Sequence, residues 1–123
     1  METYVKIGEN QYPASITGRL NDKDWNNRAS KAIRLEMTYQ EAVAIFVDDV
    51  DWSIVQTSEE IVEEIKEDGS VAYNTVINTE SYDNSDYNIA GDIVDHRDGT
   101  ITVKMGKLTA EELLSMIEGC YNL

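Results

Sequence analysis

Four stretches of the chain alternate apolar and polar residues with a period of two, which is the pattern of a β-strand with one buried face. Their apolar members are Val5 and Ile7; Tyr12, Ala14 and Ile16; Ile33, Leu35 and Met37; and Ile101, Val103 and Met105. The turn residues Gly8-Glu9-Asn10 and Arg97-Asp98-Gly99 predict that the first two strands form one hairpin and that the last strand pairs with residues 87–96 in another. These patterns predict a largely antiparallel sheet.

Two helices are expected because a threonine precedes an apolar face twice, each time with a glutamate three positions later. Thr38 with Glu41 and Thr109 with Glu112 have the spacing of a capping box. The helices are predicted at about 39–47 and 110–118, and Leu113, Leu114, Met116 and Ile117 are expected to form the buried face of the second. We therefore expect an α+β fold in which an antiparallel sheet of about five to seven strands carries these two main helices packed on it.

The chain has 123 residues, the size of one domain, so we expect a single domain over residues 1–123. The formal net charge is −14, and residues 48–95 hold fourteen acidic residues against the single base Lys66. Residues 1–47 are neutral, with six acids and six bases. We therefore predict that the N-terminal and C-terminal parts of the chain form a nearly neutral body, and that residues 57–86 form an acidic excursion from this body.

Residues 57–67 fit two local structures. Glutamate-rich TSEEIVEEIKEDG, with Thr57 and Glu60 as a cap and Gly69 as a stop, favours a helix over 58–67. The alternative is a hairpin that turns at Asp68-Gly69 and returns through the β-branched VAYNTVI. We predict a helix at 58–67, a strand at 71–77, a loop at 78–86 and a short strand at 52–56.

Composition limits the classes of function. The negative charge should repel nucleic-acid backbones, so cations or basic protein surfaces are the favoured partners. The N-terminal stretch lacks the pattern of a signal peptide, no apolar run is long enough for a membrane span, and Cys120 is the single cysteine. We expect a cytoplasmic protein that binds neither nucleic acid nor membrane.

No motif indicates catalysis, a cofactor or a metal. The single histidine, His96, lies in DHRDG, where Asp98-Gly99 predicts a tight turn rather than a zinc site. The carboxylate clusters at 48–51 and 80–86 lack the spacing of a calcium loop. Cys120 has no basic neighbour that would lower its thiol pKa. We therefore predict no enzyme activity, and no catalytic, cofactor-binding or metal-binding residues.

The acidic middle is rich in tyrosine, a residue that suits recognition surfaces. We predict protein contacts through Glu59, Glu60, Glu63, Glu64, Tyr73, Tyr82 and Tyr87.

Two stretches, YVKIGENQYPASITGRLNDKDWNNRASKAIRLEMTY and SDYNIAGDIVDHRDGTITVKMGKLTAEELL, resemble small uncharacterised proteins encoded in prophage regions of Gram-positive bacteria, often near head and tail genes. The resemblance covers about residues 4–56 and 85–117 and leaves 57–84 as a variable insertion. It implies a virion or assembly context and supplies no catalytic or ligand residues.

The leading hypothesis is a non-enzymatic, phage-related structural or assembly protein that acts by protein–protein contacts, including contacts with itself as a homo-oligomer. It would act in the host cytoplasm or in association with the virion. One alternative is an acidic decoy that imitates DNA and binds a basic DNA-binding protein. Another is a module that binds divalent cations weakly.

Overall fold

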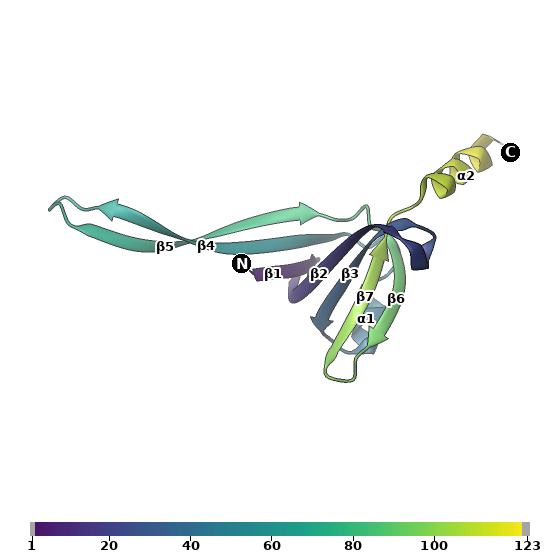
Figure 1. The fold of residues 1–123 in the computed structure, drawn as a ribbon, viewed down its shortest axis with the longest axis horizontal. Coiled ribbons are helices and arrows are strands. Elements are labelled where there is room, and N and C mark those ends of the chain that lie inside the picture. Colours follow the sequence, from purple (N-terminus) through teal and green to yellow (C-terminus); the bar gives the residue numbers. More distant parts are fainter. Residues whose placement is uncertain (1, 122–123) are drawn as a thin grey trace.

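The computed structural model describes the backbone of residues 2–121 and the side chains of residues 2–117. Within these residues seven strands form one antiparallel sheet in the order β5-β4-β1-β2-β3-β7-β6 (Figure 1). The elements are β1 (Glu2–Ile7), β2 (Asn10–Asp22), the 3-10 turn η1 (Lys23–Trp25), β3 (Arg28–Glu36), α1 (Tyr39–Ile45), β4 (Trp52–Ile65), β5 (Val71–Asp83), β6 (Ile89–Asp95), β7 (Thr100–Gly106) and α2 (Ala110–Tyr121). The predicted α+β class, with five to seven antiparallel strands and two helices, is confirmed.

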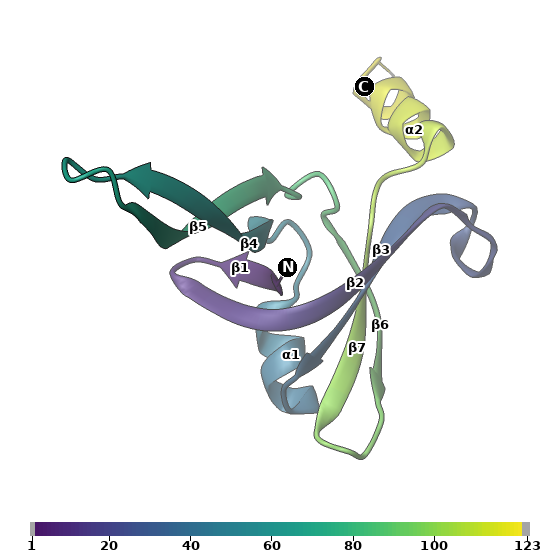
Figure 2. The same ribbon diagram turned by 60° about the vertical axis from the view of Figure 1, so that its left-hand side comes forward.

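Strand β2 joins two halves of the sheet. Its residues 10–13 pair with β1, and its residues 14–22 pair with β3. Pro13, which cannot donate a backbone hydrogen bond, is the last residue of the first pairing. The halves therefore meet at one bent strand, as the two views of the ribbon show (Figures 1 and 2).

The core lies between one face of the sheet and α1. Ala42 and Phe46 from the α1 segment are buried against strand residues from both halves of the sheet. The strand members of this core, together with Met37, are Val5, Ile33, Leu35, Trp52, Ile54, Ile101, Val103 and Met105. The alternating stretches of β3 and β7 therefore bury the residues that their pattern predicted. The Thr38 hydroxyl accepts the predicted capping bond from the Glu41 N–H at 3.1 Å.

The predicted helix at 58–67 is wrong, because these residues continue strand β4. Residues 53–65 of β4 pair with residues 71–83 of β5 through thirteen consecutive residue pairs. The turn lies at the alternative position: Gly69 has φ +84, and the Lys66 N–H donates to the Ser70 carbonyl at 2.9 Å. The pairing energy of a complete ladder exceeds the helix preference of glutamate, which is only a few tenths of a kcal/mol per residue.

Strand β5 also corrects the predicted loop at 78–86, because it continues to Asp83. Strand β1 pairs with β4 as far as Thr57. Beyond Thr57, within the described residues, β4 and β5 pair only with each other. We call residues 58–78 the arm. The arm extends away from the rest of the sheet along the longest axis of the molecule (Figure 1).

Helix α2 has the predicted capping box: the Glu112 N–H donates to Thr109 Oγ1 at 3.2 Å, and the Thr109 N–H donates to Glu112 Oε1 at 2.8 Å. Its position differs from the prediction. α1 covers a face of the sheet, whereas α2 projects beyond the end of the sheet (Figures 1 and 2).

Candidate protein-interaction surfaces

The arm presents one apolar face. Cross-strand partners in an antiparallel pair share a face, and successive residues alternate between faces. The side chains of this face are Ile61, Ile65, Val71, Tyr73 and Ile77, flanked by Glu59 and Glu63. Four of them, Ile61, Ile65, Tyr73 and Ile77, are 65–78% exposed. A cluster of large apolar side chains this open to solvent is the usual sign of a surface that another protein covers.

The opposite face of the arm, called the polar face below, carries Glu60, Glu64, Asn74 and Asn78 around Val62 and Val76, which are each 41% exposed. Glu64 Oε2 accepts a hydrogen bond from Asn74 Nδ2 at 2.8 Å, and Glu60 Oε2 accepts one from Asn78 Nδ2 at 3.0 Å. These diagonal pairs satisfy the carboxylates within the arm itself. The two faces therefore differ in chemistry.

The structure brings together five of the seven predicted contact residues. Glu59, Glu63 and Tyr73 lie on the apolar face of the arm, and Glu60 and Glu64 lie on its polar face.

Tyr82 and Tyr87 lie apart from those five residues. Tyr82 is about half exposed near the base of β5, where it pairs with Ile54, and a hydrogen bond from its hydroxyl to Glu80 raises its pKa.

Tyr87 belongs to the body rather than to the arm. Its ring contacts Trp52 edge-on at 6.5 Å, and the ammonium groups of Lys31 and Lys107 lie 4.6 and 4.8 Å from its centre. The Tyr87 carbonyl accepts a hydrogen bond from the Trp52 indole at 3.1 Å. These contacts give Tyr87 a packing role at the end of the sheet.

Helix α2 carries a second exposed apolar surface, which corrects the expectation of a buried face. Its members Leu113, Leu114, Met116 and Ile117 are each about half exposed. The face was predicted correctly from the helical spacing, but it does not lie on the sheet. The side chains of residues 118–121, among them Cys120, lie outside the described part.

Helix α2 is held to the sheet by Arg28, a residue that sequence reasoning did not select. The side chain of Arg28 is only 4% exposed and donates to both carboxylate oxygens of Glu112, at 2.7 and 3.1 Å, and to the Lys107 carbonyl at 3.0 Å. Its guanidinium group lies 4.9 Å from the centre of the Trp25 ring. The hydrogen bonds from Arg28 and then from Thr109 lower the pKa of Glu112 from 4.5 to about 2.

A second buried charge lies where β2 ends. Asp22 is fully buried, and its carboxylate lies 2.7 Å from Lys104 Nζ and accepts a hydrogen bond from Ser30 Oγ at 2.9 Å. The hydrogen bond from Lys104 lowers the pKa of Asp22, against the effect of burial. This pair ties β2 to β7 across β3.

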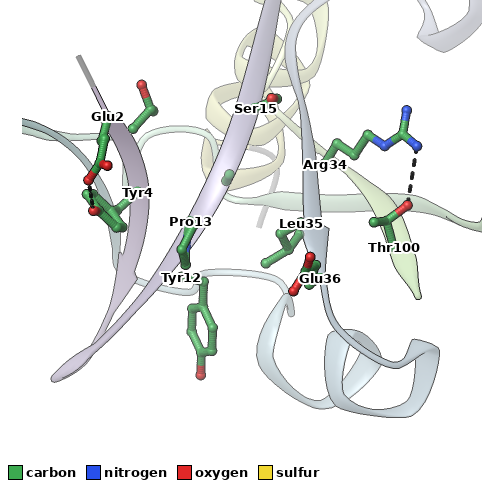
Figure 3. Close-up of a pocket in the computed structure, with 11 residues that line it drawn as sticks. Glu2, Tyr4, Tyr12, Pro13, Ser15, Arg34, Leu35, Glu36 and Thr100 are labelled. Atoms are coloured by element: carbon green, nitrogen blue, oxygen red, sulfur yellow. Dashed lines mark hydrogen bonds between the residues drawn. The ribbon is translucent and has the colours of Figure 1, made fainter. Parts of the chain in front are cut away.

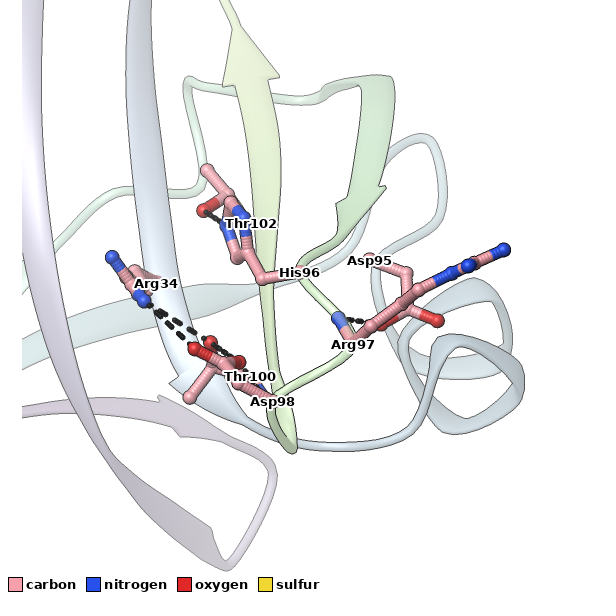
Figure 4. A network of polar contacts seen from close by, with 7 residues as sticks. All are labelled: Arg34, Asp95, His96, Arg97, Asp98, Thr100 and Thr102. Carbon is pink, nitrogen blue, oxygen red and sulfur yellow. Dashed lines mark hydrogen bonds and ion pairs between the residues drawn. The ribbon is translucent and has the colours of Figure 1, made fainter.

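His96 lies in a turn, as predicted from DHRDG (Figure 4). Arg97 and Gly99 have positive φ, and the Asp95 carboxylate accepts the Arg97 N–H at 2.9 Å. Asp98 accepts from the backbone N–H and the hydroxyl of Thr100, which lower the pKa of Asp98. The carboxylates of Asp95 and Asp98 therefore stabilise the turn of the β6–β7 hairpin.

The acidic cluster at 48–51 also has a local role. Asp48 accepts the Ala90 N–H at 2.8 Å, and Asp49 accepts from the Asn88 amide at 3.2 Å, so the two carboxylates join the segment after α1 to the start of β6 and to the residue before it. Among residues 2–117, no three His, Cys, Asp or Glu side chains gather in a way that could hold a metal ion.

A shallow hollow of about 660 Å³ lies beside Pro13, where the two halves of the sheet diverge (Figure 3). Its lining mixes the aromatic ring of Tyr12, the aliphatic side chain of Leu35 and the charged groups of Glu2, Arg34 and Glu36. Figure 3 shows Arg34 and Glu2 on opposite sides of the hollow, with Arg34 turned toward Thr100 and Glu2 toward Tyr4. The hollow therefore lacks convergent polar groups, and the arm offers the better-defined surface.

None of the helices in the described chain is long and apolar enough to cross a membrane. Comparisons with protein-family models, with curated proteins and with solved structures found no match to this chain.

Proposed function

We propose that this chain is a non-enzymatic, phage-related structural or assembly protein that works through protein–protein contacts made by its arm. The observation that carries the proposal is the apolar face of the arm, with Ile61, Ile65, Tyr73 and Ile77 open to solvent. An isolated two-stranded ribbon is at best marginally stable in water, so a partner that covers this face stabilises both the ribbon and the complex.

The arrangement of charge favours this function over a DNA-imitating decoy. The glutamates of the arm alternate between its faces, so the two on one face, Glu59 and Glu63, are four residues apart. Four residues of strand span about 13 Å, whereas phosphates follow one another about every 3.4 Å along a DNA strand. Five large apolar side chains also surround these two carboxylates, which suits a protein partner.

The phage context rests on the resemblance of residues 4–56 and 85–117 to prophage-encoded proteins. We propose that the protein acts in the host cytoplasm or in association with the virion.

A shortened-arm variant tests the proposal. Residues 59–77 are replaced by Asn-Gly, so that Ser58 and Asn78, which are partners in the ladder, flank a two-residue hairpin turn. The remaining parts of β4 and β5 keep their pairing with β1 and with each other. The variant should therefore stay folded, with the circular dichroism and cooperative unfolding of the full chain.

The functional measurement is the yield of phage particles, counted by electron microscopy, from induced cells in which the shortened-arm allele replaces the natural one. We expect particle yield to collapse while the variant remains folded and abundant. A normal yield of particles would refute the proposal, as would the absence of any particle from cells with the natural allele.

Two double variants provide a matched comparison within the arm. Ile61→Ser with Ile77→Ser changes the apolar face, and Val62→Ser with Val76→Ser makes the same kind of change on the polar face. We expect the first to reduce particle yield strongly and the second to leave it close to normal. Equal effects would show that the apolar face has no special role.

A further inference from the structure

The two outer edges of the sheet differ in how well they are protected against further strand pairing. β6 is an edge of seven residues with a register shift between Ala90 and Ile93, and it carries Asp92 and Asp95. Short length, irregularity and charge are the devices that keep an edge from pairing. β5 has thirteen residues, an unbroken register with β4, and no lysine, proline or glycine. β5 is therefore an open edge and β6 is a guarded one.

The charge of the arm leaves the β5 edge neutral. Residues 71–79 of β5, VAYNTVINT, contain no charged side chain. The four strand glutamates of the arm, Glu59, Glu60, Glu63 and Glu64, all lie on β4, the other strand of the arm. A second copy at the β5 edge would meet an uncharged strand, with the glutamates of both copies one strand further away. A basic protein that paired with the β5 edge would have its positive charges one strand away from these carboxylates.

The residues of β5 whose backbone N–H and C=O groups point away from β4 are the same residues whose side chains lie on the apolar face. The bond from the Lys66 N–H to the Ser70 carbonyl makes these two residues a hydrogen-bonded pair. In an antiparallel ladder such pairs alternate with pairs whose N–H and C=O groups point outward. The outward-pointing residues of β5 are therefore Val71, Tyr73, Thr75, Ile77 and Thr79, which lie on the apolar face.

We propose that two copies of this chain pair through their β5 edges, antiparallel about a two-fold axis at Thr75. Thr75 is the centre of the uncharged segment 71–79, so this register overlaps that segment completely with its copy. Because this contact is isologous and occupies the β5 edge of both copies, it closes at two copies instead of continuing into a filament. Residues 58–65 of β4 also lack a second neighbour in the described sheet, but they carry the four glutamates, which discourage further pairing there. This inference rests on the proposed function, in which the arm is the contact surface.

The paired arms form a continuous sheet of four strands with one enlarged apolar face. Tyr73 lies opposite Ile77 of the second copy, an aromatic–β-branched pair of the kind that stabilises antiparallel strands. Glu80 lies opposite the turn residue Ser70 of the second copy, so no two carboxylates face each other. The marginal two-stranded ribbon becomes part of a sheet of ordinary size.

Cysteine cross-linking tests the register, with Cys120→Ser as the background so that each variant holds one thiol. Thr75→Cys places the two thiols on strands whose opposed Cα atoms are about 5.5 Å apart, within the range of a disulfide. Thr79→Cys makes the same chemical change on the same strand and face, but the two Thr79 positions are eight residues out of register, about 27 Å apart. On mild oxidation we expect a covalent dimer from Thr75→Cys, while Thr79→Cys stays monomeric on a non-reducing gel.

A charge exchange at the axis tests the same contact without a thiol. Thr75→Lys and Thr75→Glu each place like charges directly opposite each other, so each should dimerise several-fold more weakly than the natural chain in sedimentation equilibrium. An equimolar mixture of the two should recover a dimer, because lysine then faces glutamate. Residue 75 faces solvent in the monomer, so neither change disturbs the core.

Three results would overturn the inference: a natural chain that remains monomeric, cross-linking that does not favour Thr75→Cys, or a different protein on the β5 edge in place of the second copy. The proposed function has a separate readout. If the shortened arm abolishes particle formation but Thr75→Cys does not cross-link, the arm is a contact surface for another partner and only the pairing of copies fails.

Discussion

At the scale of single residues, the packing of Trp25 on strands β6 and β7 requires two glycines, Gly91 and Gly106. A Cβ atom at Gly91 would lie 2.7 Å from Trp25 Cη2, and one at Gly106 would lie 2.7 Å from both Trp25 Cζ3 and Arg28 Cδ. Neither glycine needs a positive φ. Their role is to let the indole approach the backbone of β6 and β7, which places Trp25 beside the guanidinium group of Arg28.

Gly106→Ala should therefore destabilise the protein. The added methyl group must displace Trp25 and Arg28, and overpacking of this kind costs about 1–3 kcal/mol. Chemical denaturation gives the change in the free energy of unfolding. Gly18→Ala is the control, because a Cβ there meets nothing within 4 Å. It should have little effect or be slightly stabilising, by less than about 1 kcal/mol. Equal losses from the two variants would contradict the packing role of Gly106.

The Arg28–Glu112 pair should make stability depend on pH in a defined window. The pKa of Glu112 falls from 4.5 to about 2 in the folded protein. Its stabilising effect is therefore complete above pH 4.5 and is lost as the pH falls toward 2. Glu112→Gln should unfold at a lower temperature than the natural chain at neutral pH, and this difference should shrink through that window.

Thermal unfolding at a series of pH values measures this difference. Other carboxylates with lowered pKa values, such as Asp22 and Asp98, are present in both proteins, so their effects cancel. Glu111→Gln, at the exposed neighbouring position, is the matched control and should unfold close to the temperature of the natural chain at neutral pH. A difference between Glu112→Gln and the natural chain that stays constant with pH would rule out this role for the carboxylate.

At the scale of elements, the arm is the part of the sheet with the least support. The strands of the body pack apolar side chains into the core. The two strands of the arm contact only each other, and most of their side chains stay exposed to solvent. Local opening is easiest where few apolar contacts accompany the backbone hydrogen bonds.

Hydrogen exchange should reveal this difference between the arm and the body. At concentrations where the protein is monomeric, the inward amides of the arm, such as those of Ala72, Asn74 and Val76, should exchange far faster than those of Ile33 and Val103. Exchange followed by NMR gives the rate of each amide. Similar protection in the arm and in the body would mean that the arm is stable without a partner.

The elements also show what the sequence could predict. Both capping boxes and the alternating strands were predictable because each signal is local: a hydroxyl three residues before a carboxylate, or a period of two. The strand at 58–65 was not predictable, because Ile61, Val62 and Ile65 fit the apolar stripe of a helix as well as the two faces of a strand. The choice depends on pairing with residues up to 20 positions away, such as Ser58 with Asn78 and Glu59 with Ile77.

The exposed surfaces were the least predictable feature. The apolar stripe of α2 follows from its spacing, but a stripe does not say whether it faces its own sheet or a partner. The same is true of Tyr73, which faces solvent, and Tyr87, which packs on Trp52. A signal that could have helped is the neutral stretch 71–79 beside the glutamate-rich stretch 59–64, which is typical of an uncharged strand paired with a charged one.

At the scale of the whole molecule, the chain is a folded body with an arm that defines its long axis (Figure 1). The arm holds six acidic residues and Lys66, whereas residues 1–47 are neutral. The two exposed apolar surfaces lie on different sides of the body: the apolar face of the arm extends from one side, and α2 projects from the other.

Small-angle X-ray scattering should detect the extended arm. The shortened-arm variant removes about eight residues of ribbon length, so the maximum dimension of the monomer should fall by about 25 Å. Dilution series of both proteins separate this change from any change in association. A much smaller decrease would mean that the arm folds back on the body in solution.

The pairing of β7 beside β3 has a consequence for how the chain is made. Ile33 and Leu35 leave the ribosome long before residues 100–106, which later supply their neighbours Val103 and Ile101. The chain emerges N-terminus first, so until β7 is made β3 is an edge strand with apolar side chains, paired only with β2. The nascent chain therefore exposes the apolar edge of β3 until its last quarter has been translated and β7 pairs with β3.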